Sequence, residues 1–176
     1  MKRFFAILIA LAAGGCGSMP ERYIPSATGP IGAPEVVRGL SVSIAAASDA
    51  VAFGQPVFFD ITISNASRMV YWLPREPQII FAWTYANGRR DNLIRDPLED
   101  RYFTQYAASK IFPGEVRKHQ TKIPTGYFPA KGITEFKAIY TSPRNTNPEL
   151  MPFWNGEILS NAYGVDIKGR KYTGRH

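Results

Sequence analysis

The stretch VFFDITIS, residues 57–64, decides the fold. From Val57 to Ile63 every second residue is β-branched or aromatic, and the residues between them are mostly polar. This period of two is typical of a strand that buries one face. Gly54-Gln55-Pro56 precedes the stretch and Asn65-Ala66-Ser67 follows it, and both are turn signals. The stretch therefore predicts a half-buried β-strand between two turns.

The same rhythm recurs on both sides of this strand. Residues 40–46 and 134–140 alternate in the same way, and the aromatic run at 79–85 leads into Asn87-Gly88, the strongest short hairpin signal. Further short strands are expected at residues 69–73, 91–94, 102–107, 116–123 and 156–167. No segment has a convincing helical period. Short strands with turns between them predict an all-β, antiparallel sandwich.

The last part of the chain carries a resemblance to a known class of domain. The turn Pro113-Gly114-Glu115, a strand ending at Tyr140, and the closing pattern Trp154-x-Gly156-Glu157-x-x-Ser160-Asn161 resemble the end of immunoglobulin-like domains in bacterial exported proteins of unassigned function. The resemblance implies an immunoglobulin-like β-sandwich of about seven to nine strands over residues 39–167. It implies a tryptophan that anchors the start of the last strand, and it implies no catalytic residue, because sandwiches host unrelated functions.

The first residues have the layout of an export signal. Lys2 and Arg3 precede an apolar run at residues 4–13, which is about half of the roughly 20 residues that a membrane-spanning helix needs. The sequence Ala13-Gly14-Gly15-Cys16 resembles the bacterial lipoprotein signal. That resemblance implies that residues 1–15 are removed and that Cys16, the only cysteine, is acylated and becomes the membrane-anchored N-terminus. The alternative is a plain secreted protein that is cut after Ala10-Leu11-Ala12 and keeps a free thiol.

Two expectations about location follow from the lipoprotein signal. Gly17 stands where an aspartate tends to retain lipoproteins at the inner membrane, so the outer membrane, facing the periplasm, is favoured in a Gram-negative cell. Residues 16–38 are rich in proline and glycine, and we expect them to form a tether with a reach of roughly 25 Å.

A search for chemistry finds few candidates. His119 lies on a strand with alternating polar residues, so we expect it to face solvent, and His176 ends the chain. No histidines have metal-ligand spacing, and no G-x-S-x-G motif occurs. Residues 89–101 mix arginines with carboxylates, which is typical of a solvated surface. The alternative is a metal loop, but the spacing matches no calcium loop. We predict no catalytic site, no metal, no cofactor and no enzymatic activity.

The formal net charge is +7, and removal of Lys2 and Arg3 leaves 7 minus 2, or +5. Much of the excess lies in the basic tail, residues 168–176. The tail is predicted either to contact anionic envelope material or to act as a solubilising terminus. Export argues against nucleic acid as a partner.

Aromatic residues are concentrated between Tyr71 and Tyr85. The first interpretation is that they form the sandwich core. The second is an exposed strip for a glycan or another envelope protein, with Trp83, Tyr85 and Trp154 as the candidate binding residues.

Together these patterns predict a lipid-anchored envelope protein that acts as a non-enzymatic binding or structural module. One alternative is an inhibitor of an extracytoplasmic protease that uses the loop at residues 141–153, which prolines would preorganise. A second is an envelope hydrolase, which would need an acidic or histidine cluster in three dimensions.

Overall fold

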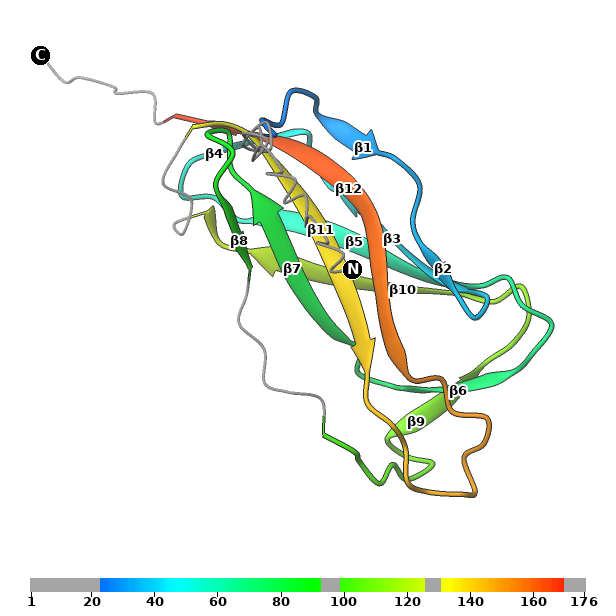
Figure 1. Ribbon diagram of the computed structural model, residues 1–176. Coiled ribbons are helices and arrows are strands. Elements are labelled where there is room, and N and C mark those ends of the chain that lie inside the picture. Colours follow the sequence, from blue (N-terminus) through cyan, green and yellow to red (C-terminus); the bar gives the residue numbers. More distant parts are fainter. Residues whose placement is uncertain (1–22, 93–98, 126–130, 170–176) are drawn as a thin grey trace, which may run out of the picture.

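The computed structural model describes residues 23–92, 99–125 and 131–169 (Figure 1). These residues form twelve β-strands and contain no α-helix. The predicted all-β, antiparallel fold class is confirmed.

Two sheets make up the sandwich, and a two-stranded ribbon lies beside them. The first sheet has the order β1 (Gly29–Ile31), β12 (Gly156–Lys168), β11 (Gly132–Ser142), β7 (Gln78–Thr84), β8 (Arg90–Asn92), and β4 (Ala50–Ala52) pairs in parallel with the end of β12. The second has the order β10 (Val116–Ile123), β5 (Val57–Asn65), β3 (Leu40–Ala46), β2 (Val36–Val37). The ribbon pairs β6 (Tyr71–Pro74) with β9 (Ala108–Ile111).

Chain order and sheet order together match the immunoglobulin arrangement. Strands β3, β5 and β10 take the places of A, B and E in one sheet, and β7, β11 and β12 take those of C, F and G in the other. The number of strands exceeds the expected seven to nine. The difference comes from short pairings that carry little periodicity, namely β1, β2, β4 and the β6–β9 ribbon.

The alternation in β5 places the core as predicted. Val57, Phe59, Ile61 and Ile63 are at most 1% exposed, whereas Phe58 faces solvent. The ring of Phe59 packs against Phe136 of the opposite sheet, with centroids 5.0 Å apart. Burying this apolar face between the sheets is the main contribution to stability in a domain without a disulfide.

Two expectations about local structure are wrong. Residues 102–107 do not form a strand, because the Thr104 carbonyl accepts hydrogen bonds from the amides of Ala107 and Ala108 and so closes a turn. The strand begins only at Ala108. The tether expected at residues 16–38 also differs, because its second half is part of the folded domain. Strand β1 pairs with β12 and β2 pairs with β3, so residues 29–31 and 36–37 belong to the sheets and not to a tether.

Cys16, Gly17 and most of the basic tail (170–176) lie outside the described residues. Lys168 is the last residue of β12 and forms an ion pair with Asp166. No helix in the described part of the chain is long and apolar enough to cross a membrane.

Candidate functional site

The β6–β9 ribbon lies at one end of the sandwich, opposite the end that carries β1 and β4 (Figure 1). It has a small core of its own, built from Ala108, Leu150 and Phe153, with Trp72 and Phe103 packed against it. The rings of Phe103 and Phe153 stack with centroids 4.9 Å apart. This second core fixes the ribbon and its neighbouring loops as one unit.

A groove with a volume of about 620 Å³ runs along the outside of this ribbon, and we call it the Trp72 groove. The ring of Trp72 is partly exposed, and the Lys110 Nζ lies 5.1 Å from its centroid. Phe112 is 54% exposed and Tyr106 is 80% exposed. The described residues that line the groove are Trp72, Arg75, Gln105, Tyr106, Ala108, Ser109, Lys110 and Phe112. The groove therefore offers three aromatic rings, two cations and an amide.

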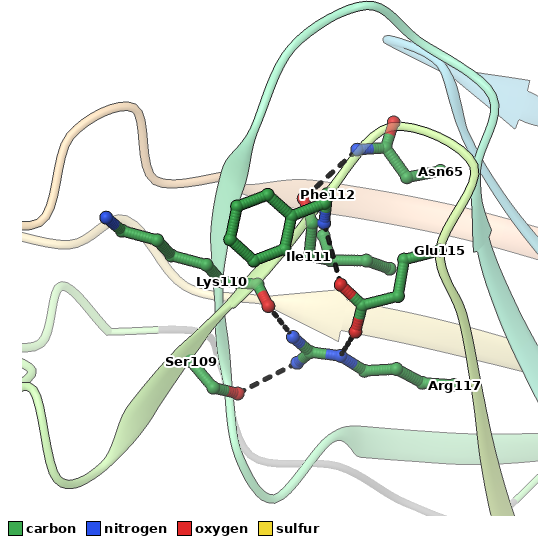
Figure 2. Close-up of polar contacts among 7 residues, drawn as sticks. All are labelled: Asn65, Ser109, Lys110, Ile111, Phe112, Glu115 and Arg117. Atoms are coloured by element: carbon green, nitrogen blue, oxygen red, sulfur yellow. Dashed lines mark hydrogen bonds and ion pairs between the residues drawn. The ribbon is translucent and has the colours of Figure 1, made fainter.

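A network of polar contacts holds one wall of the groove in place (Figure 2). The Glu115 carboxylate accepts a hydrogen bond from the Phe112 amide at 2.8 Å and pairs with the Arg117 Nε at 3.2 Å. Arg117 in turn donates to the Ser109 Oγ at 2.8 Å and to the Lys110 carbonyl. These charge-assisted bonds fix the backbone on both sides of Ile111, so the side chains of Lys110 and Phe112 extend from a rigid support.

Asn65 fixes the same region from the second sheet. Its Nδ2 donates to the Ile111 carbonyl at 3.1 Å and to the Met69 carbonyl at 2.8 Å. Its Oδ1 accepts from the Ser67 amide at 3.0 Å, which closes the predicted turn after β5. A single buried amide thus joins β5 to β9 and to the loop that precedes β6.

The three binding residues expected from the sequence are buried. Trp83 is 5% exposed, Tyr85 is 2% exposed and Trp154 is 1% exposed, and all three belong to the main core. The exposed-strip interpretation is therefore wrong for these residues, and the core interpretation is confirmed. Trp154 anchors the start of β12 by packing on Tyr140, with centroids 5.6 Å apart, and by donating from Nε1 to the Val37 carbonyl at 3.3 Å.

Sequence reasoning missed the residues that do reach the surface. Trp72 is partly exposed because it alternates with the buried Tyr71 on a strand outside both main sheets. Tyr106 falls within the strand predicted at residues 102–107, where the structure has a turn. The one signal available was Phe112, a large apolar residue directly before a Pro-Gly turn, which places an aromatic ring at an exposed corner.

A second hollow, with a volume of about 690 Å³, lies on the outer face of the first sheet beside the N-terminal segment. Its floor contains the carboxylate of Glu135, a residue only 6% exposed, which accepts a hydrogen bond from the Tyr23 hydroxyl and lies 3.7 Å from the Lys137 Nζ. The hydrogen bond to Glu135, followed by burial, raises the pKa of Tyr23. The Glu135 carboxylate in this hollow is already paired with Tyr23 and Lys137, so we take the Trp72 groove as the better candidate for ligand binding.

The loop at residues 141–153 and His119 are the other candidates, and both lie partly inside the fold. In the loop considered for protease inhibition, Asn145 and Asn147 turn inward, and the Asn147 Nδ2 donates to the Phe103 carbonyl at 2.7 Å. His119 is half-buried rather than fully solvent-facing, and burial followed by the nearby Arg117 lowers its pKa. Within the described ranges no three histidine, cysteine or acidic side chains gather as a metal site.

No family model matches the chain, and no curated protein matches it. Similar solved structures include the CARDB domain of the PF1109 protein from Pyrococcus furiosus, seen in a crystal structure in complex with di-metal ions at 14% identity and a TM-score of 0.37, covering 76% of this chain and 93% of that one. A solution structure of the same domain gives 14% identity, a TM-score of 0.37 and coverages of 73% and 94%. The C-terminal domain of wzt gives 12% identity, a TM-score of 0.38 and coverages of 89% and 83%. Similarity at this level assigns no function to the chain.

Proposed function

We propose that this protein is a lipid-anchored, non-enzymatic binding module of the bacterial cell envelope, with an immunoglobulin-like domain that binds its ligand in the Trp72 groove. The observation that carries the proposal is the groove itself. Exposed rings and cations stand on a backbone that Arg117, Glu115 and Asn65 hold rigid. Preorganised side chains of this kind lose little freedom when a ligand binds, which favours binding.

The position of the groove supports an anchored role. The groove lies at the end of the sandwich opposite β1, and β1 follows the N-terminal segment that leads back to Cys16 (Figure 1). A lipid on Cys16 would hold the domain by one end and leave the Trp72 groove at the other. Gly17 after the anchor favours the outer membrane, facing the periplasm, in a Gram-negative cell.

The anchor is tested by Cys16→Ser in the full chain. We expect the native protein to fractionate with membranes and the variant to be released as a soluble protein, because a diacyl anchor is lost together with the thiol. A variant that still pellets with membranes would contradict the anchor.

The groove is tested by immobilising the full chain and measuring its binding to a detergent extract of the envelope. We expect Phe112→Ser to lose most of the signal, while Phe58→Ser, which changes an exposed phenylalanine of β5 on a different part of the surface, keeps it. Equal signals from both variants would show that the Trp72 groove is not the binding surface.

A further inference from the structure

We propose that the Trp72 groove recognises an acidic glycan, that is, a sugar chain that carries carboxylate groups. This inference rests on the proposed function and names the ligand class for the same groove. Three features carry it: the exposed rings, the unbalanced positive charge, and a strand edge whose carbonyls are already bonded.

The rings supply flat apolar contact surfaces. Phe112 and Tyr106 are more than half exposed, and Trp72 of β6, which pairs with Lys110 of β9, lines the groove with them. A sugar ring has an apolar face made of C–H groups, and it buries this face well against an aromatic ring while its hydroxyls remain at the rim. Gln105 and Ser109 line the same groove and supply polar groups for such hydroxyls.

The charge of the groove selects an anionic ligand. Among the described residues, its lining includes Arg75 and Lys110 and no carboxylate. No described residue forms an ion pair with Lys110, whose Nζ lies over the Trp72 ring. A ligand carboxylate can pair with this cation while the exposed rings of Phe112 and Tyr106 pack on the sugar.

An extended acidic peptide fits the groove less well. Peptides that bind beside a strand add to its free edge through backbone hydrogen bonds. On β9, however, the Ala108 carbonyl accepts from the Arg75 Nε at 3.1 Å, and the Lys110 carbonyl accepts from Arg117. Because guanidinium groups already hydrogen-bond these carbonyls, a peptide backbone cannot pair with them. A ligand must then bind to side chains of the groove, as glycans do.

The experiment measures binding of the full chain in detergent by calorimetry. The probes are oligogalacturonate, its methyl ester, hyaluronan oligosaccharides and poly-glutamate. The methyl ester keeps the sugar rings but removes the charge, and poly-glutamate keeps the charge but removes the rings. We expect at least one of the two acidic glycans to bind, and poly-glutamate and the neutral ester to bind about tenfold more weakly or not at all.

Variants then assign the binding to the groove. We expect Lys110→Ala and Phe112→Ser each to weaken glycan binding by about tenfold, while Lys118→Ala, an exposed lysine on β10, leaves it unchanged. Binding of neither acidic glycan, or binding of poly-glutamate as tight as that of the glycans, would overturn the glycan inference. In that case envelope-extract binding that Phe112→Ser abolishes would leave the proposed function standing, whereas glycan binding unchanged by both groove variants would reject the groove altogether.

Discussion

Asn161 shows what a single residue contributes to this sandwich. Its Oδ1 accepts from the Ile44 amide at 2.9 Å and its Nδ2 donates to the Ile44 carbonyl at 3.1 Å, so one side chain of β12 bonds the backbone of β3 in the opposite sheet. The neighbouring Ser160 Oγ accepts from the Ala138 amide at 2.8 Å, where the register between β11 and β12 shifts. The Ser160-Asn161 pair in the closing sequence pattern therefore fills a β-bulge and joins the two sheets.

We predict that Asn161→Ala lowers the free energy of unfolding by about 2–4 kcal/mol, because it leaves the buried amide and carbonyl of Ile44 without a partner and opens a small cavity. Urea unfolding followed by tryptophan fluorescence measures the change. Asn92→Ala, at an exposed position of β8, is the matched control and should change stability by less than about 0.5 kcal/mol. If Asn161→Ala also lowers the free energy of unfolding by less than about 0.5 kcal/mol, the two sheets are joined by other contacts.

Among the elements, the N-terminal segment at residues 23–37 departs most from its expected role. Its prolines and glycines predicted a tether, yet Pro25 is buried and the Ala27 carbonyl lies so close to Gly164 that a Cβ there would be only 1.9 Å from it. Together with β1 on β12 and the hydrogen bond from Tyr23 to Glu135, this close approach makes the segment a strap across the first sheet.

We predict that Gly164→Ala detaches this strap without unfolding the sandwich, because the added methyl group clashes with backbone that cannot yield by rotating a side chain. Hydrogen exchange should show lost protection at residues 29–31 and unchanged protection in β5. Leu159→Ala, which shortens an exposed side chain on the same strand, should leave both regions protected. Loss of protection in β5 as well would show that the strap and the sandwich unfold as one unit.

The elements also explain where prediction from sequence worked. Strict alternation located β3, β5 and the first half of β11, because a sheet with one buried face imposes a period of two. The strap has no period, since its docking depends on a glycine more than a hundred residues away. The prediction of the binding residues was wrong for a related reason. Trp83 and Trp72 look alike in the sequence, and only the assignment of their strands to different sheets decides which ring is buried.

At the scale of the whole molecule, ionisable groups link stability to pH. Burial, helped by Arg117, lowers the pKa of His119 from its usual 6.5. Burial raises the pKa of Tyr140. Burial also raises the pKa of Tyr163, and a hydrogen bond to Asp49 adds to this effect. The hydrogen bond to Glu135 raises the pKa of Tyr23. Below pH 6.5 the unfolded chain binds a proton at His119 more readily than the folded one, so stability falls as the pH drops. Above pH 10 the unfolded chain releases tyrosine protons that the folded chain retains, so stability falls again.

We therefore predict a plateau of stability between about pH 6.5 and pH 10, measured by urea midpoints across the pH range. Tyr140→Phe separates the contributions, because no described residue hydrogen-bonds its buried hydroxyl, and the neighbouring Ser142 hydroxyl donates to the Trp154 carbonyl at 2.9 Å. Removing this hydroxyl should raise stability at pH 8 by up to about 1 kcal/mol and flatten the decline above pH 10. Tyr106→Phe, on an exposed ring of the Trp72 groove, should do neither. If both variants follow the native profile up to pH 11, the alkaline loss does not originate at Tyr140, and the contacts of Tyr163 with Asp49 and of Tyr23 with Glu135 become the next to test.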